Sequence, residues 1–286
     1  MCYHTVETRK VDIPVVSRNY TKRGIKMFIE ERHQAILDYL NETGRISNGE
    51  IQEKFGVSYD SAKRDLRILE EKGLLKRTHG GAIPVKQVGG NMCRDLSPAE
   101  RVENVKENYL SIAKKAVEQI EENDIVYITN ASVGYLMARN IPETLKCTVV
   151  TNSVSIAEIL RKNGNVTVIL TGGEMEKNGC FYDSFTLSVV KRLRFDKCFV
   201  TSACISADFG LSIQKSRSIE LTNTVIANSG KIYGLYPTEK IGFDSTISIC
   251  PANKLNTLIT DWDASEEDLK QFDEIGVDII ITEDVV

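Results

Sequence analysis

The amino-acid sequence predicts an α/β protein in two parts, a small helical head followed by a larger domain built on a parallel sheet. Residues 58–82 carry the pattern of a helix with a basic side, followed by a short hairpin. Beyond about residue 99, short β-branched runs alternate with helix-sized segments, which is typical of parallel strands covered by helices on both faces. The length of 286 residues also suggests about two domains.

Two helices are expected at the start of the head. Ile36, Leu37 and Leu40 mark the first, because their spacing places them on one helical face. Ser47, with Glu50 three residues later, forms a capping box that opens the second helix. A short turn over residues 55–58 then leads into a third helix.

The third helix is predicted from Ser58, an N-cap residue, to a stop at Gly73. Ala62, Leu66 and Leu69 lie at i, i+4 and i+7 and form one apolar stripe, whereas the opposite stripe is mostly basic. After this helix, basic residues lead to a Gly-Gly pair at 80–81 that turns the chain back. We interpret this hairpin as a wing.

Three helices at this spacing, followed by a basic wing, favour binding to duplex DNA. The N-terminal half of a recognition helix usually enters the major groove, where Arg and Lys contact guanine edges or phosphates. The alternative is a helical interaction module whose basic stripe is only a solvated face. The predicted DNA-binding residues are Ser47, Ser58, Tyr59, Ser61, Lys63, Arg64, Arg67, Lys76, Arg77 and His79.

The composition fits a folded protein with a local basic face. Hydrophobic residues make up 42% and charged residues 27% of the chain, which excludes a mainly disordered protein, and no apolar run reaches membrane-spanning length. The net charge of −4 does not exclude DNA binding, because binding depends on where the charges lie. Acidic residues are expected on the first helix, away from the recognition helix and wing.

The seven cysteines and three histidines show no metal-binding spacing and no disulfide framework. We therefore expect reduced thiols in a cytoplasmic protein, with neither a metal nor a cofactor. The first 26 residues lack the apolar core of a secretory signal. They are either a mobile basic arm that adds phosphate contacts or the result of an upstream start.

Four segments are predicted. They are a basic, disordered extension over residues 1–26, a winged helix-turn-helix over 27–84, a linker over 85–98 and an α/β domain over 99–286. The last begins with a helix capped by Ser97 and Glu100 that extends to about Glu121. Strands are expected at 125–129, 147–151, 166–170, 197–203, 231–236, 257–261 and 277–282 in a Rossmann-like α/β domain.

Ligands of such sheets collect at the carboxyl ends of the strands. Three loops there carry small polar residues, helix starts or paired glycines, which suit an anion such as phosphate. Simple capping and turning is the alternative for each loop. The predicted ligand-binding residues of these three loops are Asn130, Ser132, Thr151, Asn152, Ser153, Thr171, Gly172 and Gly173.

The head resembles the helix-turn-helix of the DeoR family of bacterial transcriptional regulators. Its members resemble one another in a VS…RRDL…LE…G.L.R.HGGA pattern. The matching residues here are Val57, Ser58, Lys63, Arg64, Asp65, Leu66, Leu69, Glu70, Gly73, Leu75, Arg77, His79, Gly80, Gly81 and Ala82. Lys63 replaces the usual arginine, which keeps the charge but loses the planar bidentate fork, so weaker base readout is expected there.

The remainder, from about Ser97 onward, resembles the sensor domain of the same family, which is similar in fold to ribose-5-phosphate isomerase and commonly senses phosphorylated sugars. The resemblance is carried by VVTNSVSIAEIL at 149–160, LTGGE at 170–174, LRFDKCFV at 193–200, FGLS at 209–212 and LITD at 258–261. It implies a homo-oligomeric repressor of a carbohydrate or related metabolic operon, controlled by a small phosphorylated metabolite.

Three departures from the family pattern concern the sensor. A usual Asp-x-Gly-Thr-Thr segment is replaced by residues 129–133, and a common Lys is Thr222. An Asp-x-x-Lys segment keeps only its lysine, Lys240, with Pro237 in place of the Asp; the resemblance implies that Lys240 is a further effector-binding residue, beside those of the three loops. The effector pocket is therefore expected to be altered, and one alternative is a DNA-binding protein with a degenerate, ligand-free sensor.

An isomerase-like enzyme is the remaining alternative. Enediol chemistry needs a carboxylate base near the substrate carbon, and no motif places one. Asp208 and Glu220 are the candidates, for which a surface or turn position is the simpler explanation. The sequence therefore predicts a protein that is not an enzyme.

Overall fold

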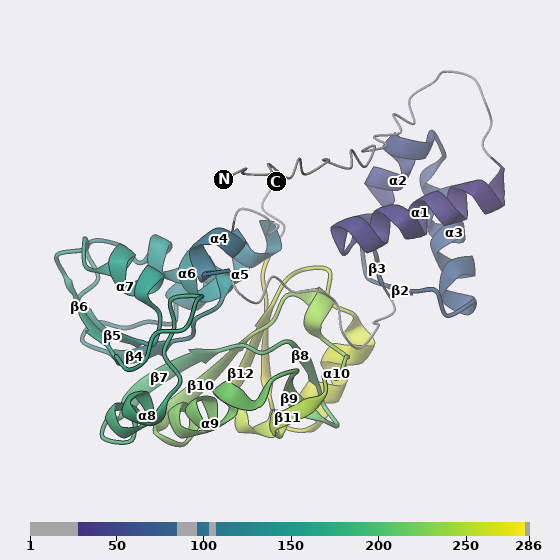
Figure 1. The fold of residues 1–286 in the computed structure, drawn as a ribbon. Helices are drawn as coiled ribbons and strands as arrows, with labels where there is room; N and C mark the ends of the chain where they lie inside the picture. Colours follow the sequence, from purple (N-terminus) through teal and green to yellow (C-terminus); the bar gives the residue numbers. More distant parts are fainter. Residues whose placement is uncertain (1–27, 85–95, 103–106, 284–286) are drawn as a thin grey trace, which may run out of the picture.

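The computed structural model describes residues 28–84, 96–102 and 107–283 of the chain. These residues form a winged helix-turn-helix head and an α/β domain with a parallel sheet, which confirms the predicted fold class (Figure 1). The predicted extension over 1–26 and most of the predicted linker lie outside the described residues.

The head contains three helices and a small antiparallel sheet in the order β1-β3-β2. Its elements are α1 (Ile29–Thr43), β1 (Ile46–Ser47), α2 (Asn48–Phe55), α3 (Tyr59–Glu71), β2 (Leu75–Arg77) and β3 (Gly81–Pro84). The helices and the wing, β2 with β3, were predicted. The strand β1 was not, because two residues are too few to show a period.

The predicted helix caps are present. The Ser47 hydroxyl oxygen accepts a hydrogen bond from the Glu50 amide at 3.1 Å, and the Glu50 carboxylate accepts one from the Ser47 amide at 2.7 Å. Ser58 caps α3 in the same way, accepting from the Ser61 amide at 3.2 Å. These bonds satisfy amides that have no partner inside the helix.

Asp65 fastens α3 to α1. Its carboxylate accepts hydrogen bonds from Arg32 Nε at 2.6 Å and Arg32 Nη2 at 3.0 Å, and His33 Nε2 lies 3.1 Å away. The Asp65 side chain is 4% exposed and that of Arg32 is 11% exposed. The bond to Asp65 raises the pKa of Arg32, so the guanidinium is firmly charged. This aspartate of the family-like motif holds the helices together.

Gly81 allows the wing to approach β1. A Cβ atom at this position would lie 2.0 Å from the carbonyl oxygen of Ile46, closer than any side chain permits. The glycine therefore lets β3 pair with β1, through Ser47 opposite Gly81.

The α/β domain contains a seven-stranded sheet in which every neighbouring pair is parallel, in the order β13-β12-β10-β7-β4-β5-β6. The strands are β4 (Ile125–Ile128), β5 (Cys147–Thr151), β6 (Val166–Leu170), β7 (Phe195–Val200), β10 (Ser229–Leu235), β12 (Thr257–Thr260) and β13 (Asp278–Ile281). All seven predicted strands exist. The fourth begins and ends earlier than predicted.

Helices cover both faces of this sheet. They are α4 (Pro98–Val102), α5 (Glu107–Val117), α6 (Ser132–Asn140) and α7 (Val154–Leu160), then α8 (Ser184–Val190), α9 (Ile219–Ala227) and α10 (Glu266–Glu274). The core beneath α5–α7 contains Phe199, and the core beneath α8–α10 contains the adjacent Cys198 and Val200. Each strand thus alternates between two apolar layers, as expected for a doubly covered sheet.

Two details differ from the predicted elements. The helix expected to reach Glu121 ends at Val117, where Gln119 and Ile120 make tighter turn bonds to Ala116 and Val117. A small antiparallel sheet of β8 (Cys204–Ser206), β9 (Gly210–Ile213) and β11 (Ile247–Cys250) was not predicted. Three short helical turns, Ser216–Ser218, Thr238–Lys240 and Ala252–Lys254, complete the fold. Within the described ranges, no helix combines the length and apolarity that crossing a bilayer requires.

Candidate DNA-binding face and ligand site

The helix α3 presents a row of exposed side chains on the side opposite the head core. Tyr59, Lys63, Arg64 and Arg67 are all exposed, at spacings that place them on one helical face. The buried side of the same helix carries Ala62, Leu66 and Leu69, as predicted. The row is therefore available to an outside partner while the helix stays packed.

The cations of this row differ in their partners. Among the described residues, neither Lys63 nor Arg64 forms an ion pair, although Lys63 Nζ lies 4.6 Å from the centre of the Tyr59 ring. Arg67 Nε lies 3.9 Å from a Glu71 oxygen, a loose and exposed pair. Exposed pairs of this kind contribute little to stability. All three side chains can therefore turn toward phosphates or base edges at small cost.

The predicted serines occupy the helix starts. Ser47 and Ser58 are the caps of α2 and α3, and the Ser61 hydroxyl lies 2.9 Å from that of Ser58. Their hydroxyls stand at helix N-termini, where anions are favoured by the helix dipole. A phosphate contact at these positions remains a prediction.

The predicted wing residues differ in whether they face solvent or the α/β domain. Arg77 lies on the exposed side of β2, with its Nε 2.8 Å from Glu70, and His79 is exposed in the turn between the wing strands. Lys76 instead extends toward the α/β domain, where its Nζ lies 2.6 Å from Asp268 Oδ2. The structure thus groups the predicted DNA-binding residues of α3 but holds Lys76 apart from them.

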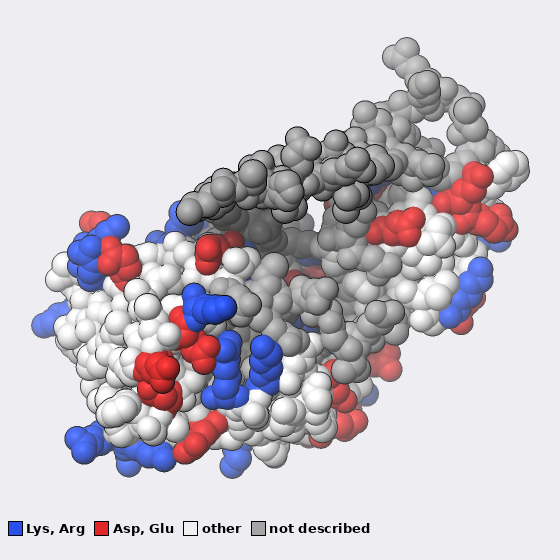
Figure 2. Space-filling view, viewed as in Figure 1, with Lys and Arg blue, Asp and Glu red and all other residues white. Residues whose placement is uncertain are grey.

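Acidic side chains gather at the N-terminal end of α1, on the visible face of the head in Figure 2. Glu30 and Glu31 lie in the first turn of this helix. These two acids thus begin a different helix from α3, whose own first turn carries Asp60. An approach of DNA toward α3 remains a prediction.

The predicted effector loops meet at the carboxyl edge of the large sheet. The chain runs from β4 outward through β5 to β6 and then returns to β7 on the other side of β4. The strand order therefore reverses between β4 and β7, which is where doubly wound sheets bind ligands. Asn130 follows β4 and Thr201 follows β7 at this point.

Asn130 belongs to a polar cluster at this edge. Its side-chain amide donates to the Tyr182 hydroxyl, and its backbone carbonyl oxygen accepts from Arg101 Nη2 at 2.9 Å. Burial raises the pKa of Tyr182 to about 12, so the phenol stays protonated at neutral pH. Burial likewise raises the pKa of the neighbouring Cys180 thiol. The cluster therefore offers neutral hydrogen-bonding groups beside the cationic Arg101.

Thr201 carries a buried hydroxyl oxygen that has no hydrogen-bond partner among the described residues. The Thr171 hydroxyl, at the end of β6, is in the same state. Such groups are costly unless a water or a ligand satisfies them. Both lie at the edge where a ligand is expected, so they mark candidate contacts.

The loop after β5 is held by its own side chains. Asn152 accepts from the Tyr127 hydroxyl at 3.0 Å and donates to the Phe181 carbonyl at 2.8 Å, and Thr151 donates to the Ile128 carbonyl at 3.0 Å. The structure therefore uses Thr151 and Asn152 to build the loop. Ser153, which is fully buried, starts α7 beside them.

The Gly172–Gly173 turn after β6 packs closely against Asp183, the N-cap of α8. Both glycines have positive φ, and a Cβ on Gly173 would lie 2.5 Å from Asp183 Oδ1. The Glu174 amide donates to Asp183 at 2.6 Å, and the Thr186 hydroxyl donates to the Gly172 carbonyl at 2.8 Å. The turn is thus fixed by α8.

Ser132, at the start of α6, is the remaining predicted residue of these loops, and it is buried.

Lys240 lies in the turn after β10 and is largely buried, with Nζ 5.7 Å from the centre of the Tyr109 ring. Burial, followed by the charge of Glu239, raises the pKa of Tyr109, while the charge of Arg101 acts in the opposite direction. Arg101 and Lys240 therefore both lie near Tyr109. Together they supply positive charge at the strand ends.

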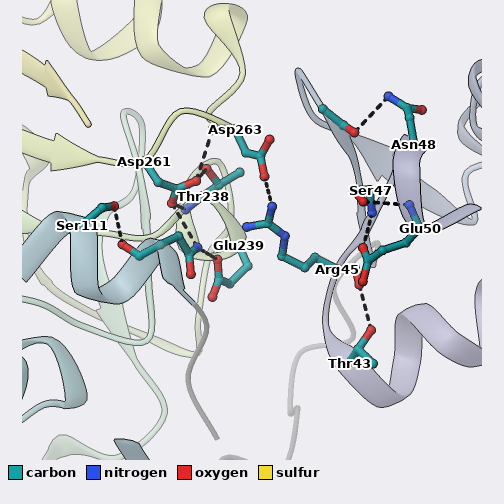
Figure 3. Close-up of polar contacts among 12 residues, drawn as sticks. Thr43, Arg45, Ser47, Asn48, Glu50, Ser111, Thr238, Glu239, Asp261 and Asp263 are labelled. Carbon is teal, nitrogen blue, oxygen red and sulfur yellow. Dashed lines mark hydrogen bonds and ion pairs between the residues drawn. The ribbon is translucent and has the colours of Figure 1, made fainter. Parts of the chain in front are cut away.

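Asp261 supports this turn from the end of β12, as Figure 3 shows. Its carboxylate accepts hydrogen bonds from the Thr238 amide at 2.8 Å, the Thr238 hydroxyl at 2.7 Å and the Asn108 amide group at 3.2 Å. The same Asn108 group donates to Glu239 at 3.1 Å. Asp261 is fully buried and occupied by these donors, so it shapes the turn.

The sequence reasoning missed Arg101, Tyr182 and Thr201. A lone arginine in a short helix, a tyrosine after a loop and a threonine past a strand carry no motif. Thr201 alone had a usable signal, since it follows the strand at which the sheet order reverses. Among the described residues, no group of three His, Cys, Asp or Glu side chains is placed to hold a metal ion.

Profiles of two protein domains match the chain. The "DeoR-like helix-turn-helix domain" matches residues 32–88, and the "DeoR C terminal sensor domain" matches residues 105–262. The chain belongs to the DeoR family. The two DeoR matches fall on the head and on the α/β domain in the predicted order.

Two relatives illustrate the DeoR match. The "HTH-type transcriptional repressor GlcR" of Bacillus subtilis is 30% identical over 260 residues, covering 90% of this chain and 98% of its own. The "Lactose phosphotransferase system repressor" of Staphylococcus epidermidis is 31% identical over 235 residues, covering 81% and 91%. Both relatives therefore match most of the length of this DeoR-family chain.

Among solved structures, the ribose 5-phosphate isomerase A of Methanocaldococcus jannaschii is 14% identical, with a TM-score of 0.34. The match covers 46% of this chain and 52% of the isomerase. A TM-score of this size does not define a shared fold. The fold of this DeoR-family member is therefore assigned from its own strand order.

Proposed function

We propose that this protein is a sequence-specific DNA-binding regulator that represses a carbohydrate or related metabolic operon. The exposed row on α3 is the observation that carries the proposal, because Lys63 and Arg64 form no ion pair within the described residues. Similarity to repressors of the same family supports it. We expect the protein to act in the cytoplasm as a homo-oligomer that places two α3 helices on repeated half-sites.

Binding to DNA is tested with the full chain and duplexes covering the region upstream of its own gene. Fluorescence anisotropy over a salt series should give a specific complex at least about 10³-fold tighter than random duplex. The logarithm of affinity should fall linearly with the logarithm of salt concentration, by about 0.9 per phosphate contact. Equal affinity for all duplexes would contradict sequence-specific regulation.

We further propose that the strand-end site binds a small phosphorylated metabolite. Arg101 and Lys240 would supply positive charge, and Asn130 and Thr201 would supply neutral polar groups. Thr171 and the Gly172–Gly173 turn stand at the end of β6, on the same edge of the sheet. Ser132 and Ser153 stand at the starts of helices that point toward this edge. Thr151 and Asn152 would act by holding the loop in place.

Replacing Lys240 with alanine should abolish the response to the effector and leave DNA affinity in its absence unchanged. A hydrogen-bonded charge of this kind is typically worth about 1.5–3 kcal/mol to a phosphate ligand. Thermal-shift screening of sugar phosphates identifies the ligand, because a compound that binds only the folded protein raises its melting temperature. Lys231→Ala, at an exposed lysine in β10, is the matched control. An unaltered response in Lys240→Ala would place the site elsewhere.

Thr201→Val offers a second test of the site. The hydroxyl has no protein partner among the described residues, so its replacement by a methyl group should cost no stability. Ligand affinity, measured by calorimetry, should nevertheless fall about tenfold if the hydroxyl bonds to the ligand. Unchanged affinity, or a loss of stability without a loss of affinity, would remove Thr201 from the site.

The full occupation of Thr151 and Asn152 by protein partners favours one alternative, a sensor that holds no ligand. No melting-temperature shift with any of a broad set of sugar phosphates would support it.

We also propose that the α/β domain performs no catalysis. The Asp261 carboxylate is occupied by Thr238 and Asn108, Glu220 pairs with Lys191 on the outside of α9, and Asp208 is exposed in a turn. Isomerase turnover by the purified protein would overturn this.

A further inference from the structure

The head contacts the α/β domain through its wing and through the segment before β1. Arg45, between α1 and β1, forms an ion pair with Asp263, which follows β12 (Figure 3). Lys76 of the wing donates to Asp268 in the first turn of α10, with Nζ 2.8 Å from Oδ1 and 2.6 Å from Oδ2. We call Asp263 and Asp268, with the adjacent Gly242 and Phe243, the docking surface.

These two ion pairs are more than loose surface contacts. The side chains of Asp263 and Asp268 are 9% and 13% exposed, and those of Arg45 and Lys76 are 20% and 30% exposed. Partial removal from water strengthens the attraction between such charges relative to an exposed pair. Lys76 Nζ also lies 5.3 Å from the centre of the Phe243 ring, a favourable position for a cation.

The backbone of the two domains approaches closely at the same place. A Cβ on Gly80, in the turn of the wing, would lie 2.7 Å from Asp263 Oδ1. A Cβ on Gly242 would lie 2.5 Å from Asp268 Oδ1 and 2.7 Å from Lys76 Nζ. Glycine at both positions allows the wing to lie directly on the docking surface.

The docked wing conflicts with a wing bound to DNA. A phosphate contact by Lys76 requires its ammonium to leave Asp268, because a carboxylate at 2.6 Å would repel the phosphate. The turn at Gly80 is likewise occupied by Asp263. We propose that the docking surface binds the chain's own head in competition with duplex DNA, so that the docked arrangement holds DNA affinity down.

This inference rests on the proposed DNA-binding function, and the Asp268→Asn variant of the full chain tests it. The substitution keeps the shape of the side chain and removes the charge that holds Lys76. Affinity for the specific duplex should rise about fivefold, because a larger fraction of molecules is then competent to bind. Asp273→Asn removes one negative charge from the exposed side of the same helix and is the control for a general electrostatic effect.

Hydrogen exchange gives a second readout that DNA contact alone would not produce. Amides at 262–270 belong to the segment that carries Asp263 and Asp268 and not to the head, so adding the duplex to the wild-type chain should speed their exchange. Asp268→Asn should speed it without DNA, and Asp273→Asn should not. Equal DNA affinity of the two variants, or unchanged exchange at 262–270 when DNA binds, would overturn the inference. A wild-type chain that binds no specific duplex would instead contradict the proposed function.

Discussion

Replacing Asp65 with alanine is expected to destabilise the head by about 3 kcal/mol, the lower end of the range for breaking a buried ion pair. The loss leaves the Arg32 guanidinium with neither of its two hydrogen bonds, and it removes the acceptor beside His33. Arg32 keeps some access to water, which limits the cost. Hydrogen exchange of the α1 and α3 amides in the full chain measures the loss without requiring a separate fragment.

Glu71→Ala is the matched control for Asp65→Ala. It removes an acid from the same helix, but Glu71 is exposed and lies 3.9 Å from Arg67. Its effect should stay within about 0.5 kcal/mol, as for most surface substitutions. If the α1 and α3 amides are as well protected from exchange in Asp65→Ala as in Glu71→Ala, then Asp65 does not fasten the helices, and its burial must have another cause.

Arg64→Ala is expected to weaken binding to the specific duplex by about 1–3 kcal/mol if Arg64 reads a base, with a smaller loss for random duplex. Arg64 is exposed on α3 and makes no ion pair with a described residue, so the free protein should lose little stability. Anisotropy titrations at several salt concentrations separate the two roles. A phosphate contact would lower both affinities alike and reduce the salt slope by about one.

Arg192→Ala is the control for loss of charge alone, since Arg192 is exposed after α8, away from the head. Unchanged affinity and salt slope in Arg64→Ala would remove this residue from the DNA interface. Equal losses in the two variants would indicate that only the overall charge matters. A specific loss in Arg64→Ala alone would assign base readout to α3.

Local rules were enough to place the three helices of the head, the helical start at Ser97 and the seven strands of the large sheet. Ser47 and Ser58 mark helix starts because their hydroxyls satisfy amides within three residues, and the strands stand out as short, β-branched apolar runs. The strands of the small antiparallel sheet escaped prediction because they are short, and β9 and β11 are joined through a register shift between Ser248 and Cys250. A period of two cannot be read through such an irregularity.

The candidate sites were less accessible to sequence reasoning. Lys76 and Asp268 are 192 residues apart, and no local pattern relates them. The wing lysine was therefore assigned to DNA from its charge alone. Likewise, the Thr201 hydroxyl lacks a hydrogen-bond partner among the described residues because of how the strand ends pack around it, which the sequence does not reveal. Sequence patterns identified the elements and their exposed faces, whereas contacts between residues far apart in the sequence were visible only in the three-dimensional structure.

The turn over Thr238–Lys240 has two sides. Thr238 and Glu239 line a small space of about 10 Å³ together with Arg45 and Thr78 of the head, while Lys240 Nζ lies over the Tyr109 ring of α5. A single turn thus borders both the head and the proposed effector site, to which Lys240 belongs. Equilibrium thermodynamics makes any influence of effector binding on DNA binding reciprocal. Whatever factor an effector imposes on operator affinity, the operator must impose on effector affinity. Titrating the effector with and without saturating DNA would therefore measure how strongly the two are coupled, without any substitution in the chain.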